Sequence, residues 1–404
     1  MTKKSKRDIL IPSDIDGVAA IINKNFGKGT ILRASDAKSL RIKRVSFGVF
    51  ALDIASGGGV PRGRITMLHG DKSTGKSCIA MKIAAEFQRC DRLTGKPYLR
   101  IDSGGEIEEL DFGRSGEPQP MNVVWVDLEH TFEIDWARKW GIDTDYLYVV
   151  QPASSEEAID ICDGLIRSNK CDLVIVDSIA ALSPSAEIEG ASGEVHMGLN
   201  ARLFNQALRK WTSGLNACGL LSETQCSIVL INQFRLKIGG GVVYKTTPCG
   251  EGHKYFASIE IVFTKKDFIN DPITNRPIGI LVEFMFKKNK TAPPMRGGQY
   301  EIYFVNSDTN DGIGSTGEIG QIFDFAKYWG LIKSSGKWVS FNPPIVKESI
   351  KIDGKKKTIE FLYNHPEIVS KLKEQVLDLE YKWREEGVTP VSIGYEEDIS
   401  NEKA

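Results

Sequence analysis

A glycine-rich stretch at residues 70–77 (GDKSTGKS) constrains the fold of this 404-residue chain more than any other feature. It matches the pattern G-x-x-x-x-G-K-[ST], and it lies between a predicted strand at 64–70 and a predicted amphipathic helix at 76–88. In that context the glycines let backbone N–H groups wrap around phosphates, and the helix directs its positive end at the anion. The sequence therefore predicts a phosphate-binding loop made of Gly70, Asp71, Lys72, Ser73, Thr74, Gly75, Lys76, Ser77 and, in the first helical turn, Cys78.

Two residues of this loop have predicted roles of their own. Lys76 would neutralise the β- and γ-phosphates of a nucleotide, and the Ser77 hydroxyl would bind Mg²⁺. The alternative is a simple glycine-rich turn, and the strand and helix on either side argue against it.

Carboxylates that follow two apolar strands complete the predicted site. Asp177 ends the segment LVIVD and would hold Mg²⁺ through water, although an aspartate there could also cap the following turn. Glu129 follows VVWVDL and is placed to orient a water molecule on the γ-phosphate. Asp127 points the same way by strand periodicity, so the residues alone leave both carboxylates open for this role.

Strands and helices alternate from residue 62 to residue 180, which predicts an α/β fold. The strands are near-continuous apolar runs, so we expect a mostly parallel sheet with helices on both faces. Three later strands would continue this sheet, antiparallel at its end. Strands are expected at 64–70, 123–129, 172–178, 227–234, 254–264, 280–289 and 300–305, and helices at 76–88, 155–168 and 199–218.

The other segments have weaker patterns. We expect a short helix at 8–25, an extended segment at 26–33, a polar surface insertion with its own hairpin at 91–121, and a mobile glycine-rich loop at 238–252. Helical segments around the hairpin GKWVSF predict a small α/β domain near the C-terminus, followed by an acidic, disordered tail. The chain is divided accordingly into an N-terminal arm at 1–33, a core at 34–311, a C-terminal domain at 312–384 and a tail at 385–404.

The overall charge excludes a general electrostatic attraction of the whole chain to nucleic acid or to membrane. Lys and Arg number 52 and Asp and Glu 53, so the net charge is −1, and any anion site must be local. The seven cysteines are odd in number and lack a C-x-x-C pair, which argues against a structural zinc site or a disulfide framework. The absence of a secretory signal or of an apolar run of about 18 residues favours a cytoplasmic protein.

Several ordered segments together resemble the RecA-type recombinases. The match runs from about residue 20 to 90 and from 121 to 305, and it is looser from 312 to 385. The segments that carry it are FGKGTILR (26–33), FALDIASGGGVPRGRI (50–65), VDLEHTFEIDWARKWGID (126–143), QPASSEEAIDICDGLIRSNKCDLVIVDSIAALSPSAEIEG (151–190), HMGLNARLFNQALRK (196–210), INQFRLKIGG (231–240) and KKNKTAPP (287–294).

The resemblance implies an ATP-driven filament that forms on single-stranded DNA and pairs it with homologous double-stranded DNA. It makes Glu129, not Asp127, the base for hydrolysis, and it makes Gln233 the sensor that couples the γ-phosphate to a DNA loop. It places the adenine against Glu133, Trp136 and Phe304. Trp136 offers a stacking face, and ordinary core packing of this aromatic residue is the rival interpretation.

For DNA, the resemblance implies two loops, at 188–199 and 234–253. Basic residues in the second loop would lie where phosphates pass, and a solvated surface loop is the alternative. Arg202 and Arg209 are seven residues apart on a predicted helix and share a face, and Tyr244 could insert beside a base. The basic residues of the second loop are Arg235, Lys237, Lys245 and Lys254, set against one acid, Glu251.

The resemblance also implies contacts between subunits. The N-terminal arm would pack on a neighbour, and Lys288 and Lys290 would reach the neighbour's γ-phosphate as arginine fingers do. Alternation of these lysines along a strand also fits a charged edge strand that blocks aggregation. Insertion 91–121 has no counterpart in the bacterial archetype, and only Lys265 and Lys266 fit the family's duplex-capturing patch.

These departures would suit a phage-encoded homologue. Two other classes of function remain open from the residues. One is a RecA-fold motor of another kind, a helicase or branch-migration ATPase, although no zinc module or protease-like domain is visible. The other is a non-hydrolysing binding module, and the intact set of Lys76, Ser77, Glu129 and Asp177 argues against it.

Overall fold

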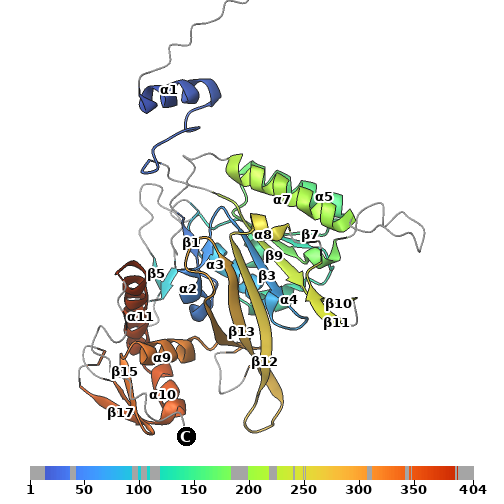
Figure 1. The fold of residues 1–404 in the computed structure, drawn as a ribbon. Coiled ribbons are helices and arrows are strands. Elements are labelled where there is room, and N and C mark those ends of the chain that lie inside the picture. The colour runs from blue at the N-terminus through green and yellow to red at the C-terminus, as the bar shows by residue number, and fades with distance from the viewer. Residues whose placement is uncertain are drawn as a thin grey trace, which may run out of the picture.

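The computed structural model is built around one eight-stranded sheet, in the order β14-β13-β12-β3-β9-β8-β6-β7 (Figure 1). Neighbouring strands from β12 to β7 are parallel, whereas β13 is antiparallel to both of its neighbours, β12 and β14. This arrangement confirms the predicted mostly parallel α/β sheet with an antiparallel end. The structure describes residues 14–36, 42–92, 99–101, 107–109, 119–182, 199–217, 225–239, 242–248, 250, 252–306, 312–341, 345–346, 348–386 and 389.

The strands of this sheet and the helices beside it have the following bounds. The strands are β3 (Ile65–Gly70), β6 (Val123–Asp127), β7 (Leu147–Val150), β8 (Leu173–Asp177), β9 (Ser227–Gln233), β12 (Ile259–Asn270), β13 (Pro277–Asn289) and β14 (Gly297–Tyr303). The helices are α2 (Phe50–Ser56), α3 (Lys76–Gln88), α4 (Ile134–Lys139), α5 (Ser155–Ser168), α7 (Leu199–Ala217) and α8 (His253–Phe256). A short strand pair, β1 (Arg44–Val45) with β2 (Val60–Pro61), and two single turns, η3 (Thr144–Tyr146) and η4 (Ile179–Ala181), complete the core.

The sheet separates two hydrophobic cores because side chains alternate between the faces of each strand. Along β6, Val123 and Trp125 join the core beneath α2 and α3, whereas Val124 and Val126 join the core beneath α5 and α7. Both faces are therefore covered, which explains the continuous apolar runs that predicted buried parallel strands.

A third core lies in the C-terminal segment and includes Phe50 and Ile54 of α2. Its elements are α9 (Glu318–Tyr328), a three-stranded antiparallel sheet of β15 (Ile332–Ser335), β16 (Trp338–Phe341) and β17 (Ile350–Asp353), and the helices α10 (Gly354–Tyr363) and α11 (Pro366–Glu386). The elements agree with the expected mixture of helices and a hairpin, and the domain boundaries stay a prediction. The expected tail lies almost wholly outside the described residues, and its first two residues belong to α11.

Four local expectations were wrong. Residues 27–36 form turns and bends instead of an extended segment. The segment 238–252 contains part of an antiparallel hairpin, β10 (Arg235–Gly239) with β11 (Val242–Thr246), where a loop without pattern was expected. The strand predicted from 254 begins at Ile259, because the residues before it form α8. The strand predicted at 123–129 ends at Asp127.

Outside the core, α1 (Ile15–Phe26) has no buried residue, and Figure 1 shows it apart from the sheet. The structure places its start at Ile15, and the earlier part of the expected helix falls outside the described residues. Within the insertion, β4 (Leu99–Ile101) pairs with β5 (Ile107–Glu109), as predicted. Among the helices that the structure describes, none combines the length and apolarity needed to cross a membrane.

Candidate functional site

The predicted phosphate loop joins the end of β3 to the start of α3, and its glycines are required by close contacts. A Cβ atom at Gly70 would lie 2.7 Å from the Phe263 carbonyl oxygen, and one at Gly75 would lie 2.3 Å from Ile302 Cδ1. Gly75 also has a φ of +81° and precedes α3 without a capping side chain. The first amides of α3 are therefore left facing the loop, as anion binding requires.

Lys76, Ser77 and Asp177 meet beside this loop. The Lys76 ammonium donates to the Asp71 carbonyl at 2.6 Å, and it is only 6% exposed. Burial lowers the pKa of Lys76, while Asp177, Asp71 and Glu129 oppose that effect. Burial raises the pKa of Asp177 to about 6, although a hydrogen bond with the Ser77 side chain lowers it. A buried carboxylate, a hydroxyl and a cation at a glycine cradle fit a nucleotide phosphate with a divalent metal.

Glu129 lies at the centre of a small polar network. Its Oε1 accepts a hydrogen bond from Ser178 Oγ at 2.5 Å and from Gln233 Nε2 at 3.0 Å. Ser178 follows the carboxylate at the end of β8, and Gln233 ends β9. The structure therefore brings together Glu129 and the predicted sensor Gln233, which are 104 residues apart in sequence.

The rival carboxylate Asp127 is used elsewhere. It is 1% exposed and accepts hydrogen bonds from the Thr131 and Phe132 amides and from Gln151 Nε2. Because β6 ends at Asp127, strand alternation does not extend to Glu129, and the periodicity argument that made the two equivalent was wrong. The contacts favour the exposed Glu129 as the carboxylate that meets a ligand.

Of the three residues predicted for the adenine, Glu133 directly precedes α4, Trp136 lies on it, and Phe304 directly follows β14. The Glu133 carboxylate caps α4 by accepting hydrogen bonds from the Asp135 and Trp136 amides. Trp136 and Phe304 are half-buried against the core that contains α3. Gly314 lies between the two elements: its amide donates to the Tyr303 carbonyl, and a Cβ atom at this position would lie 2.9 Å from the Lys139 carbonyl oxygen. Cys78 borders the same core, where burial raises its pKa to about 12.

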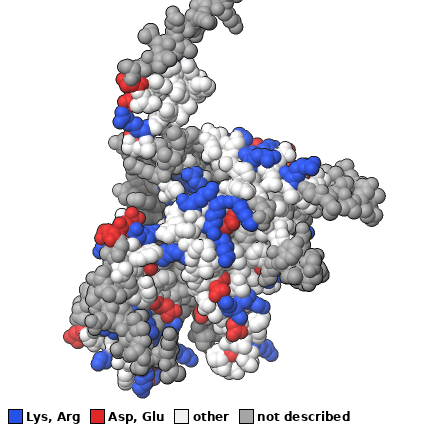
Figure 2. All heavy atoms as spheres, viewed as in Figure 1, with Lys and Arg blue, Asp and Glu red and all other residues white. Residues whose placement is uncertain are grey.

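Basic side chains form an exposed face near α7 and α8. Figure 2 shows Lys and Arg gathered over the region where Figure 1 places α8 and the adjoining parts of β12 and β13, with others over α7. Arg202 and Arg209 are both exposed on α7, and Lys254 is exposed on α8. The prediction that the two arginines share a helix therefore agrees with the structure, and their contact with DNA stays a prediction.

The hairpin β10–β11 carries the other predicted DNA residues. Arg235 begins the hairpin, and its guanidinium donates to the Ala180 carbonyl of η4 at 2.8 Å. In the backbone register Lys237 pairs with Tyr244, and Leu236 pairs with Lys245. Of the loop predicted at 188–199, only residue 199 belongs to the described part of the chain. Glu251 lies outside that part.

Lys288 and Lys290 lie at the end of β13, and both touch α8. Lys288 donates to the Lys254 carbonyl, and Lys290 donates to the Tyr255 carbonyl at 3.1 Å. β13 pairs with β12 along its length, but β14 pairs only with Gly279–Met285, so Lys288 lies beyond the part of β13 that β14 covers and the edge-strand interpretation stays open there. Glu260 pairs with both Lys288 and Met67, whereas Phe263 pairs with Gly70. Lys288 is thus about 10 Å along and about 10 Å across the sheet from its own phosphate loop.

Ser178 is a polar partner that sequence reasoning missed. Its position directly after the carboxylate that ends β8 was the available signal.

Lys266 was expected in a basic patch, but it forms an ion pair with Glu283 at 3.0 Å. That pair lies between β12 and β13, in a register where Thr264 faces Glu283.

The fold and this site define a P-loop nucleotide-binding protein. The model of the RecA N-terminal domain matches residues 14–96 and 116–308, so the unmatched gap falls within the insertion. The chain is 36% identical over 364 residues to Protein RecA of Mannheimia haemolytica, which covers 89% of this chain and 85% of that protein. It is 34% identical over 389 residues to Protein RecA of Leptospira biflexa, covering 93% and 87% of the two chains. The chain therefore belongs to the RecA family, and the resemblance seen in its motifs is confirmed.

Proposed function

We propose that this protein is an ATP-dependent DNA recombinase that forms filaments on single-stranded DNA and catalyses pairing and strand exchange with homologous duplex. The observation that carries the proposal is the hydrogen bond between Gln233 and Glu129. Gln233 lies two residues before the hairpin β10–β11, and the Glu129 carboxylate is close enough to the phosphate loop to act on the charge of Lys76. A single contact therefore links the nucleotide site to the segment expected to bind DNA.

The residues of the site divide the hydrolytic reaction among them. Lys76 and the first amides of α3 would hold the phosphates of ATP, and Ser77 and Asp177 would hold Mg²⁺, which neutralises phosphate charge when bound. Glu129 would take a proton from water as the water oxygen bonds to the γ-phosphorus and the bond to the bridging oxygen of ADP breaks. Ser178 would orient Glu129, because its hydroxyl donates to the same carboxylate oxygen as Gln233.

The link to Gln233 gives hydrolysis a means of responding to DNA. When Gln233 turns toward a γ-phosphate, it must release Glu129, so the hairpin that follows Gln233 would shift with the state of the nucleotide. Glu133, Trp136 and Phe304 would contact the adenine. DNA would cross the face that carries Arg202, Arg209 and Lys254, together with the hairpin residues Arg235, Lys237, Tyr244 and Lys245.

Electron microscopy with single-stranded DNA and a non-hydrolysable ATP analogue tests this proposal most directly. We expect helical filaments that need both ligands, together with an ATPase rate that rises when DNA is added. Closed rings would instead indicate the alternative, a helicase or branch-migration motor of the same fold. Free monomers without DNA-stimulated ATPase activity would contradict both functions.

A further inference from the structure

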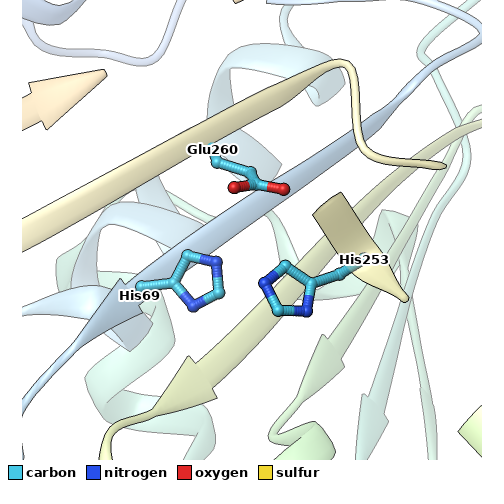
Figure 3. A group of neighbouring side chains, drawn as sticks. All are labelled: His69, His253 and Glu260. Carbon is cyan, nitrogen blue, oxygen red and sulfur yellow. The ribbon is translucent and has the colours of Figure 1, made fainter. Parts of the chain in front are cut away.

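Two histidines and one glutamate come together beneath α8, outside the nucleotide site. His69 precedes the first residue of the phosphate loop on β3, His253 begins α8, and Glu260 lies on β12. One potential ligand atom from each of the three lies within 4.8 Å of the other two, and all three residues are buried. Figure 3 shows the imidazole rings facing each other, with the Glu260 carboxylate turned toward the space beside them.

The two rings present nitrogen atoms suited to a metal. His253 Nδ1 lies 3.1 Å from the Gly250 carbonyl oxygen, which can only accept, so Nδ1 carries the hydrogen and Nε2 keeps its lone pair. Metal-bound histidines typically have this arrangement, in which the second ring nitrogen donates to a carbonyl. His69 is 4% exposed, and its Nδ1 has no hydrogen-bond partner among the residues that the structure describes.

The donor set selects one class of ion. Two imidazoles and one carboxylate suit Zn²⁺ and similar transition metals, whereas Mg²⁺ and Ca²⁺ prefer oxygen ligands. The cations of Lys76 and Lys254 act on His69, and Lys288 lies beside Glu260 in the sheet register. These positive charges disfavour a weakly held cation, so only strong bonds to imidazole would retain an ion there.

We propose that His69, His253 and Glu260 form a binding site for a zinc-type transition-metal ion. Tetrahedral zinc with bonds of about 2.0–2.1 Å would draw the donor atoms to about 3.3 Å from one another. The cluster must therefore contract on the order of an ångström. α8 is a helix of four residues and can supply this movement more readily than the sheet strands can.

Such an ion would join α8 to two strands, β3 and β12, that already pair with each other in the sheet. It would fix His253, and with it the carbonyls of Lys254 and Tyr255 that Lys288 and Lys290 contact. It would also attach this segment to β3 directly before Gly70. The proposed ion would thus hold α8, which follows the hairpin β10–β11 in the chain, against the strand that leads into the phosphate loop. The site does not depend on the proposed recombinase function.

Binding of ZnCl₂ and CoCl₂ to the full, reduced chain tests the site, with Mg²⁺ in excess to occupy the phosphate loop. Competition with a chromophoric chelator should show one zinc ion per chain, and Co²⁺ should give a tetrahedral visible spectrum without a thiolate charge-transfer band. His253→Gln and Glu260→Gln should each weaken zinc binding at least about tenfold. His365→Gln is the matched control, because its ring also has Nδ1 on a main-chain carbonyl, that of Phe361, and should leave binding unchanged.

Amide hydrogen exchange provides a second measurement that does not depend on the variants folding. Zinc should slow exchange in peptides that cover residues 250–257 of the wild-type chain. Equal zinc affinity in the wild-type and Glu260→Gln proteins would overturn the proposal, as would a Co²⁺–thiolate band, which would assign the ion to cysteine. Zinc binding without slower exchange at 250–257 would also overturn it.

Discussion

Glu129 and Asp127 illustrate how neighbouring carboxylates acquire different roles. Asp127 is buried, and both of its oxygens accept hydrogen bonds from the turn that follows β6 and from Gln151. Glu129 lies at the surface, where one oxygen accepts from Ser178 and Gln233. A general base must reach its proton, so accessibility and orientation favour Glu129 over its more strongly bonded neighbour.

Glu129→Gln should abolish most ATP hydrolysis while preserving nucleotide binding. The substitution keeps the size of the side chain but removes the base, a change that typically costs about 10²–10⁴-fold in rate. DNA binding in the presence of ATP should persist or tighten, because the ATP-bound state is not consumed. The measurement is steady-state ATPase activity with and without single-stranded DNA.

Asp127→Asn is the matched control for this experiment. Its amide nitrogen cannot accept the hydrogen bonds that one aspartate oxygen accepts, so the variant should lose roughly 1–3 kcal/mol of stability. We expect its ATPase rate at a temperature where it is folded to fall much less than that of Glu129→Gln. Wild-type turnover in Glu129→Gln, with loss of turnover in Asp127→Asn, would reverse the assignment.

At the residue scale, the strand-loop-helix context of the predicted phosphate loop is confirmed, because a local sequence pattern specifies it. The residues of the phosphate loop could be predicted together because they are consecutive, from the last residue of β3 to the first turn of α3. It could not separate Glu129 from Asp127 without the family resemblance, because that distinction depends on where β6 ends. The contacts of Ser178 and of the cluster at His69 depend on strand order, which no local pattern contains.

At the scale of elements, α2 is held to the preceding chain by one half-buried carboxylate. Asp53 accepts hydrogen bonds from the Phe47 amide at 2.7 Å and from Ser46 Oγ at 2.5 Å. Burial raises the pKa of Asp53 from 3.8 to about 7, against the effect of these hydrogen bonds. The folded protein therefore keeps a proton on Asp53 in a pH range where the unfolded chain has released it.

The sign of the resulting pH dependence follows from that difference in bound protons. Between about pH 4 and pH 7 the folded state holds more protons at this group, so its contribution to stability falls as the pH rises. Asp53→Asn should remove this part of the slope and leave the other groups unchanged. The measurement is the free energy of unfolding by urea across that range for both proteins, and parallel curves would contradict the shift.

The hairpin β10–β11 is the element expected to follow the DNA backbone. Lys237→Ala should weaken binding to single-stranded DNA and reduce the slope of log affinity against log salt by about 0.7 for each phosphate that the lysine neutralises. Lys333→Ala, on β15 of the C-terminal sheet, is an exposed control that should change neither quantity. An unaltered slope in Lys237→Ala would show that this position does not touch the backbone.

The insertion is closed at its base by contacts that a deletion must respect. Arg92 donates from its amide to the Gln119 carbonyl, and its side chain binds Asp172 at 2.9 Å. Replacing residues 94–117 with a short Gly-Ser turn keeps this closure and should leave cooperative unfolding intact. Circular dichroism during heating is the measurement. Loss of a cooperative transition would show that the insertion belongs to the core.

The elements that sequence reasoning missed are short ones. The segment KYFASIEIVFT was interpreted as one strand because its apolar residues continue through α8, although its first three residues belong to that helical turn. The hairpin β10–β11 was missed because its glycines suggested a loop, while five backbone pairs form around them. The long strands were predicted well because burial on both faces leaves a run of apolar residues that turns do not imitate.

At the scale of the whole molecule, the C-terminal segment is fastened to the core by a half-buried charged group. Arg296 follows the end of β13 and donates to the Ile54 carbonyl of α2 and to Glu380 of α11. Glu380 also accepts from Trp329 Nε1 at 3.1 Å, and the Arg296 guanidinium lies over the Trp383 ring. The same stretch of chain, between β13 and β14, carries Lys290 at its start, so packing of the C-terminal segment supports the region where the lysines lie.

The role proposed for Lys288 and Lys290 depends on a contact between subunits. Both lysines donate to carbonyls of α8, and the strand register places Lys288 far along and across the sheet from the phosphate loop of its own chain. They cannot therefore act on their own nucleotide, and any contact with a γ-phosphate must be made in a neighbouring subunit. A cation supplied in trans stabilises charge in the transition state and is worth about 10³–10⁵-fold in GTPases that use one.

A mixing experiment tests this role. Lys288→Ala/Lys290→Ala and Lys76→Ala should each be nearly inactive as DNA-stimulated ATPases, the first because it lacks the donated cations and the second because it lacks its phosphate-loop lysine. Filaments assembled from both should regain part of the activity, because some intact phosphate loops then face intact lysine pairs. Lys265→Ala is a control lysine on the neighbouring strand β12, and its filaments should hydrolyse ATP without mixing. Normal hydrolysis by the double lysine variant alone, in DNA-bound filaments, would show instead that these lysines only hold α8 in place.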